Sequence, residues 1–134
     1  MLMPKKTKYR KEHKRYHSGQ ASSLLKVSFG AHGLKALEGS WVSSRQIEAA
    51  RRVMTKYTKK GGKIWIRMFP DKPVTLKGGE IPMGKGKGAV DHYVAIVKPG
   101  MVMFEIAGID EATSKKALEL AAYKLPVKCK FVSK

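Results

Sequence analysis

The chain has 134 residues and carries 28 Lys and Arg against 10 Asp and Glu, a formal net charge of +18. That length suits one domain with a modest core, and so large an excess of positive charge indicates a polyanionic partner. The apolar runs are too short for a bilayer-spanning helix, and the single Cys129 excludes an internal disulfide or a cysteine zinc cluster. We therefore expect an intracellular protein without a signal peptide.

The positive charge is concentrated early, because residues 1–67 have a net charge of +14 and residues 68–134 only +4. Residues 1–20 form a basic arm without helix or strand periodicity, which we expect to become ordered on a partner. Aromatic rings between cations suit phosphate pairing and base stacking, whereas a purely solubilising tail would not need them. The predicted contacts of the arm are Lys5, Lys6, Lys8, Tyr9, Arg10, Lys11, Lys14 and Arg15.

Residues 21–134 predict a single α+β domain with a mixed or antiparallel sheet and two helices. Apolar runs bounded by glycines predict strands over 24–29 and 34–38. A strongly alternating segment predicts another strand over 63–69, before a Pro-rich turn. One face of that strand mixes aromatic rings with cations such as Arg67, which is typical of either an RNA-facing surface or a second packing face.

The spacing of Ser43 and Gln46 matches a capping box and predicts a helix that runs to about Thr58. One face of this helix is apolar. It consists of Ile47, Ala50, Met54 and Tyr57. The opposite face carries cations, with only Glu48 at its flank, whereas a merely solvated face would mix both signs. The phosphate contacts predicted on it are Arg45, Arg52, Lys56 and Lys59.

A short predicted strand over 74–76 leads into a glycine-rich loop over 77–89. The centre of this loop is Met83, Gly84, Lys85, Gly86, Lys87 and Gly88. No Gly-Lys-Ser/Thr follows, so the loop is not a phosphate-binding P-loop. In an extended backbone the two lysines point the same way, roughly 6–7 Å apart, which suits two phosphates of one strand. A solvated hairpin tip is the alternative interpretation.

In the last third, residues 90–98 and 101–107 are expected to pair as a hairpin across a Pro-Gly turn. Asp110 is the expected cap of a helix over 111–124, which precedes a last strand over 127–132. The predicted inner face of that helix is Ala117, Leu118, Ala121 and Leu125.

No constellation of catalytic or metal-ligating residues is present. His13 and His17 have helical metal-pair spacing, but they lie in strongly cationic surroundings. Asp91 and His92 are neighbours on a predicted strand, so we expect their side chains to point to opposite faces. Cys129 is expected in the core. We therefore predict no enzyme, no cofactor, no metal and no small-molecule substrate.

A series of segments, in order along the chain, carries a more specific signal. The segments are 4–11, 44–52, 62–67, 69–73, 83–88 and 124–128. Together they closely resemble the bacterial large-subunit ribosomal protein L-sixteen family, and the resemblance spans nearly the whole chain. One departure is Pro82, where many relatives carry an arginine that is hydroxylated in some of them.

The resemblance implies an α+β domain of the hammerhead type that binds large-subunit rRNA near the peptidyl-transferase region. The expected location is a cytoplasmic ribosome of bacterial type, with an organelle ribosome as the alternative. It implies neighbouring ribosomal proteins as partners, and no membrane. The family's contacts carry over to Lys5–Lys11 in the arm and to Arg45, Arg51 and Arg52 in the helix. By the same resemblance, Met83–Gly88 reaches toward A-site and P-site tRNA.

The alternative function is a free-standing basic regulator that binds RNA or DNA outside the ribosome. Charge and arm composition fit both classes of protein. Cofractionation separates them, because a ribosomal protein stays with the large subunit through a moderate-salt gradient and a regulator does not.

Overall fold

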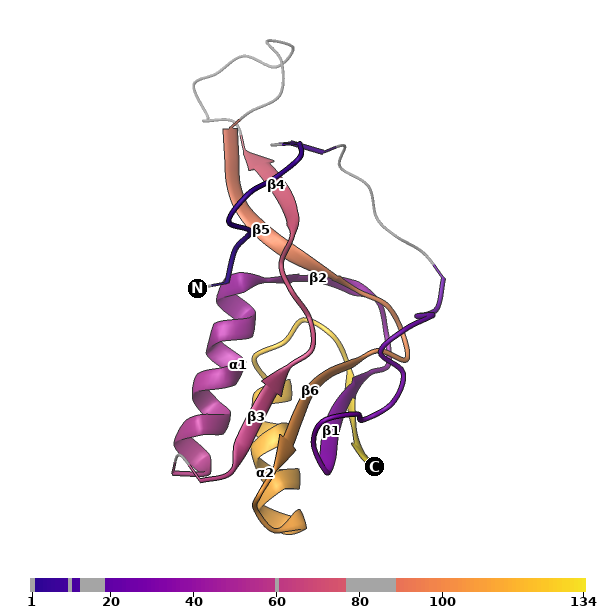
Figure 1. The fold of residues 1–134 in the computed structure, drawn as a ribbon, viewed down its shortest axis with the longest axis vertical. Helices are drawn as coiled ribbons and strands as arrows, with labels where there is room; N and C mark the ends of the chain where they lie inside the picture. Colours follow the sequence, from indigo (N-terminus) through magenta and orange to yellow (C-terminus); the bar gives the residue numbers. More distant parts are fainter. Residues whose placement is uncertain (1, 10, 13–18, 60, 77–88) are drawn as a thin grey trace.

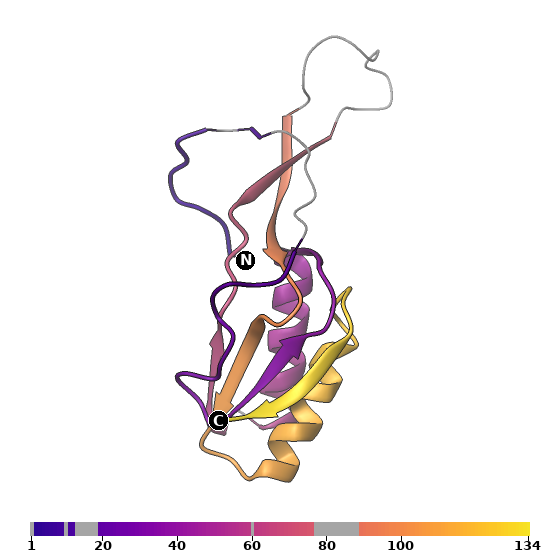
Figure 2. The same cartoon turned by 90° about the vertical axis from the view of Figure 1, so that its right-hand side faces the viewer.

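Two antiparallel sheets and two helices make up the part of the chain that the structure describes (Figures 1 and 2). The computed structural model describes residues 2–9, 11–12, 19–59, 61–76 and 89–134. This arrangement confirms the predicted α+β class, with both sheets antiparallel rather than mixed.

The larger sheet has four strands in the order β3-β6-β1-β7. Their bounds are Lys63–Ile66 for β3, Val102–Ala107 for β6, His32–Ala36 for β1 and Cys129–Ser133 for β7. The register places Ile66 beside Phe104 and Phe104 beside Leu34, so apolar side chains of three strands share one face.

The smaller sheet has three strands in the order β2-β5-β4 and extends beyond the larger one along the long axis of the molecule (Figure 1). Its strands are β2 (Ser40–Ser43), β5 (Ala89–Val97) and β4 (Lys72–Leu76). Leu76 and Ala89 pair at the far end of the sheet, where the chain enters and leaves residues 77–88. The chain therefore enters and leaves the glycine-rich segment at the end of the smaller sheet that is farthest from the helices.

The core lies between the larger sheet and the helices α1 (Ser44–Tyr57) and α2 (Glu111–Ala122). Its sheet side is formed by Leu34, Ala36, Phe104 and Ile106. Its helix side is formed by Ile47, Ala50 and Met54 of α1 and by Ala117, Leu118 and Ala121 of α2. The predicted apolar faces of both helices are thus confirmed, except that Tyr57 is 41% exposed at the end of α1.

The opposite face of the larger sheet is covered by the segment that precedes β1 (Figure 2). Val27 of this segment is buried, and a Cβ added to Gly33 would come within 3.0 Å of its side chain. A Cβ at Gly30 would lie 2.7 Å from the carbonyl oxygen of Ile106. The segment and the sheet therefore approach more closely than a side chain at Gly30 would permit.

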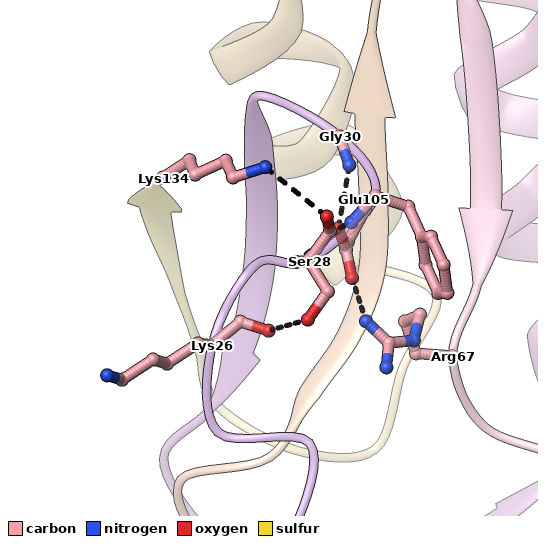
Figure 3. A network of polar contacts seen from close by, with 7 residues as sticks. Lys26, Ser28, Gly30, Arg67, Glu105 and Lys134 are labelled. Atoms are coloured by element: carbon pink, nitrogen blue, oxygen red, sulfur yellow. Dashed lines mark hydrogen bonds and ion pairs between the residues drawn. The ribbon is translucent and has the colours of Figure 1, made fainter.

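A buried carboxylate fixes this segment to the sheet (Figure 3). Glu105 of β6 is fully buried, and its Oε1 accepts hydrogen bonds from the backbone N–H groups of Ser28, Phe29 and Gly30 at 2.7–2.9 Å. Its Oε2 accepts a hydrogen bond from the guanidinium of Arg67. Burial raises the pKa of Glu105, but these donors outweigh burial and hold it below the usual 4.5.

The strand predicted over 24–29 is wrong, and the contacts of Glu105 explain why. The N–H groups that a strand would donate to a neighbour are donated to a side chain instead. Leu24 has a φ of 58°, which interrupts an extended backbone. An alternating sequence pattern alone does not reveal either feature.

The hairpin predicted between 90–98 and 101–107 is also wrong. β5 pairs with β2 and β4, whereas β6 pairs with β1 and β3, so the Pro-Gly connection carries the chain from one sheet to the other. At this crossing the N–H of Gly100 donates to the carbonyl of Ala36 at 2.8 Å. The predicted turn over 70–73 also ends early, since Lys72 and Pro73 already pair with β5.

Replacing the buried carboxylate, Glu105→Gln, is expected to lower the free energy of unfolding by about 3–5 kcal/mol. The reason is that Arg67 loses its ionic partner, and the three N–H groups share a weaker acceptor. Urea denaturation at neutral pH measures the effect. The matched control Glu119→Gln, on the exposed side of α2, should change stability by less than about 0.5 kcal/mol. Equal effects of the two substitutions would contradict the role assigned to Glu105.

The stabilisation by Glu105 should also depend on pH. Because the pKa is lowered in the folded state, the contribution is complete above the unfolded-state pKa of about 4.3 and is lost as the pH falls through the folded-state value. The stability difference between the native protein and Glu105→Gln is therefore expected to be constant near neutrality and to shrink in acid. Denaturant unfolding of both proteins over a pH series tests this, and a difference that stays constant to the lowest pH would refute it.

Candidate nucleic-acid interface

The start of α1 is fixed by the predicted capping box. The N–H of Gln46 donates to the hydroxyl of Ser43 at 3.2 Å, and the N–H of Ser43 donates to the side chain of Gln46 at 2.9 Å. At the other end, the hydroxyl of Thr58 donates to the carbonyl of Met54 at 3.0 Å. Both ends of the helix have hydrogen-bond partners and one face is packed in the core. The rotation of the helix about its axis is therefore fixed.

That rotation presents a row of cations to solvent, as the sequence predicted. Arg45, Arg52, Lys56 and Lys59 are all exposed. Within the described part of the chain, Arg45, Lys56 and Lys59 have no acidic partner. An outward row of cations, three of which are left without an acidic partner by the described residues, is a surface suited to phosphates.

The acid at the flank of the row orients two arginines. Glu48 accepts hydrogen bonds from Arg51, with Nε to Oε2 at 3.1 Å, and from Arg52, with Nε to Oε1 at 3.3 Å. The hydrogen bonds from Arg51, together with the charges of both arginines, lower the pKa of Glu48 to about 2. Glu48 therefore stays ionised at neutral pH and holds two guanidinium groups side by side on the helix surface.

Two adjoining hollows run along the C-terminal half of α1, with volumes of about 310 and 420 Å³. They share Arg51 and Thr55 and so adjoin each other, and we refer to the two hollows together as the groove. The cations that line the groove are Arg51, Arg52, Lys56, Lys59 and Lys63. Its floor toward β3 includes Gly61 and Gly62, whose small size leaves backbone accessible.

The sequence prediction missed Lys63 and Thr55 as parts of this surface. The available signal was the Gly61-Gly62 pair directly after the helix, because it returns the chain along α1 and brings β3 beside it. Gly62 has a φ of 72°, and a Cβ there would lie 2.5 Å from the carbonyl oxygen of Ala107. The turn that forms the floor of the groove therefore requires glycine at this position.

The described part of the arm contacts the domain. Leu2 packs against the core, and the chain begins beside the N-terminal end of α1 (Figures 1 and 2). Glu12 lies 3.8 Å from the ammonium of Lys72, which is itself buried in β4 and stands 5.7 Å from the ring centre of Trp41. The arm thus starts where the cationic face of α1 starts.

The arm residues predicted as contacts are exposed where they are described. These residues are Lys5, Lys6, Lys8, Tyr9 and Lys11. The ammonium of Lys8 stands 5.8 Å from the ring centre of Tyr9. The other predicted contacts lie outside the described residues. They are Arg10, Lys14, Arg15 and the loop residues Met83, Gly84, Lys85, Gly86, Lys87 and Gly88.

Arg67 is placed differently from the other predicted contacts. Its side chain is only 13% exposed and forms an ion pair with Glu105 inside the fold. Arg67 itself therefore has a packing role, one of the two alternatives that the sequence left open, whereas Lys63 and Phe69 on the same predicted face are exposed. We do not include this arginine among the proposed phosphate contacts.

Two other sets of reactive side chains, Asp91 with His92 and Cys129, lie outside this surface. Asp91 and His92 do not point apart as predicted, because Asp91 Oδ2 and His92 Nδ1 are 2.7 Å apart at an exposed site on β5. Cys129 is half-buried against the core, and burial raises the pKa of its thiol to about 11. Among the described residues, no three potential metal ligands cluster.

No helix in the described ranges has the length and apolar character needed to cross a membrane. One protein family matches the chain across its sequence. The sequence model of the ribosomal protein L16p/L10e family matches residues 4–132. These residues include the arm, the cationic face of α1, both sheets and the glycine-rich loop.

Proposed function

Because this chain belongs to the ribosomal protein L16p/L10e family, a structural protein family of the large ribosomal subunit, we propose that it binds large-subunit rRNA along the outer face of α1. The observation that carries this proposal is the row of exposed cations on α1, in which Arg45, Lys56 and Lys59 have no acidic partner among the described residues. A groove lined by five cations beside the same helix extends the surface.

The binding mode that this geometry supports is phosphate contact rather than base readout. Lysine and arginine side chains on a rigid helix fix the position of a backbone without selecting a sequence. The paired guanidinium groups of Arg51 and Arg52 suit one phosphate or two adjacent ones, because Glu48 holds them together. The arm adds further contacts near the start of α1.

The glycine-rich loop supplies a second role in this proposal. It lies in sequence between β4 and β5, and the described residues on either side of it, Leu76 and Ala89, pair at the end of the smaller sheet away from the helices. A domain anchored to rRNA through α1 would extend this tip outward. On the resemblance to the ribosomal protein family, we assign Met83–Gly88 to contact with A-site tRNA, and P-site tRNA as a further candidate, with Lys85 and Lys87 as the charged groups.

The double substitution Lys56→Ala with Lys59→Ala tests the anchoring surface. We expect weaker binding to a large-subunit rRNA transcript and a slope of log K against log salt that is shallower by roughly 1.4–1.8, since each phosphate contact contributes about 0.7–0.9. Filter binding over a range of KCl concentrations measures both quantities.

The matched control is Lys115→Ala with Lys116→Ala, which removes the same charge from the exposed side of α2. This control should leave the slope nearly unchanged. If both pairs reduce the slope equally, diffuse charge rather than the face of α1 binds the RNA, and the proposal is wrong.

The loop is tested by Lys85→Ala with Lys87→Ala. We expect an unchanged melting temperature, because a segment of glycines and lysines contributes little to a core, but weaker A-site tRNA binding by subunits that contain the variant. Binding of tRNA to purified subunits measures the effect, with Lys115→Ala plus Lys116→Ala on α2 as the control. Normal tRNA binding and normal subunit maturation in this variant would contradict a role of Lys85 and Lys87 in binding tRNA.

A further inference from the structure

A second surface, separate from the cations of α1, is formed by two aromatic side chains. Phe29 is 60% exposed although it is large and apolar. Its ring stacks on that of Trp65 in β3, with ring centres 6.2 Å apart and planes inclined by 20°. Much of the Phe29 ring therefore remains accessible beside an ordered neighbour.

The backbone that carries Phe29 is held rigidly. The N–H groups of Ser28, Phe29 and Gly30 all donate to the fully buried Glu105, and the carbonyl of Ser28 accepts a hydrogen bond from Lys134 at 3.3 Å (Figure 3). An exposed aromatic ring on a fixed loop loses little conformational entropy when a partner covers it. This is the arrangement of a binding platform rather than of a loosely packed side chain.

The surroundings of the ring are cationic. The guanidinium carbon of Arg67 stands 4.6 Å from the ring centre of Phe29, and the ammonium of Lys63 stands 5.4 Å from that of Trp65. The carboxylate of Glu105, which fixes the backbone of this segment, is buried and already paired, so it does not repel a phosphate.

We propose that the exposed face of Phe29 stacks on an unpaired RNA base, while Lys63 faces the phosphates beside that base. Stacking on aromatic rings flanked by cations is how proteins bind single-stranded segments of RNA. Lys63 also lines the groove beside α1, which connects the two surfaces. The inference rests on the proposed function, because it adds base stacking to an RNA contact made chiefly through phosphates.

Binding of two RNA probes tests the proposal: single-stranded oligoadenylate and a perfectly paired duplex of the same length. Phe29→Leu should weaken oligoadenylate binding by roughly 5- to 100-fold, because stacking is lost, without changing the salt slope, since no phosphate contact is removed. Duplex binding should stay the same. The conservative variant Phe29→Trp should restore oligoadenylate binding.

Phe29→Trp also provides an optical readout that does not depend on the folding of the leucine variant. Its new indole emission, measured against the native protein, should be quenched by oligoadenylate and not by the duplex. Thermal melts of both variants establish that they fold.

Three outcomes would contradict the stacking proposal, and each points to a different explanation. If oligoadenylate binds the native protein and Phe29→Leu equally well, or does not quench Phe29→Trp, then stacking is wrong while the phosphate contacts of α1 stand. If neither probe binds the native protein, the proposed function fails as well. If Phe29→Leu binds RNA normally but is depleted from assembled large subunits, the aromatic pair contacts a protein neighbour instead.

Discussion

A single buried carboxylate connects three parts of this structure that are distant in sequence. Glu105 receives three backbone N–H groups from residues 28–30 and the guanidinium of Arg67, which follows β3. Removing a charge of this kind from water is costly unless every acceptor position is filled, and here both oxygens are engaged. Glu105 therefore adds side-chain contacts to the backbone pairing of β6 with β3 and fastens the segment before β1 against these strands.

Pairing of acids with cations also distinguishes the charges in the rest of the described structure. Acids are used inside or along the fold: Glu105 pairs with Arg67, Glu48 with Arg51 and Arg52, and Glu12 approaches Lys72. Exposed cations remain on several elements, and those of α1 form a row that continues into the groove beside it. A protein with a net charge of +18 therefore satisfies its buried charges within the fold and leaves many cations at its surface for an anionic partner.

Sequence reasoning predicted what local periodicity and capping determine. The capping box, the apolar faces of both helices and the exposure of the α1 cations follow from spacing within one element. Strand partners were not accessible in this way, since nothing local to 90–107 shows that its two strands belong to different sheets. The role of Arg67 was missed for a similar reason, because its partner Glu105 lies 38 residues away. The signal available in the sequence was Glu105 itself, a lone acid within an otherwise apolar strand, because a buried acid needs a cationic partner.

The central claim is that the outer face of α1 is the surface that the fold reserves for RNA. A cryo-EM map of the large ribosomal subunit containing this chain tests it most directly. The account predicts rRNA phosphates within contact distance of Arg45, Lys56 and Lys59, and along the groove between α1 and β3, with the exposed side of α2 free of such contacts. An α1 face that is open to solvent, or covered by a protein neighbour while RNA contacts α2, would contradict it.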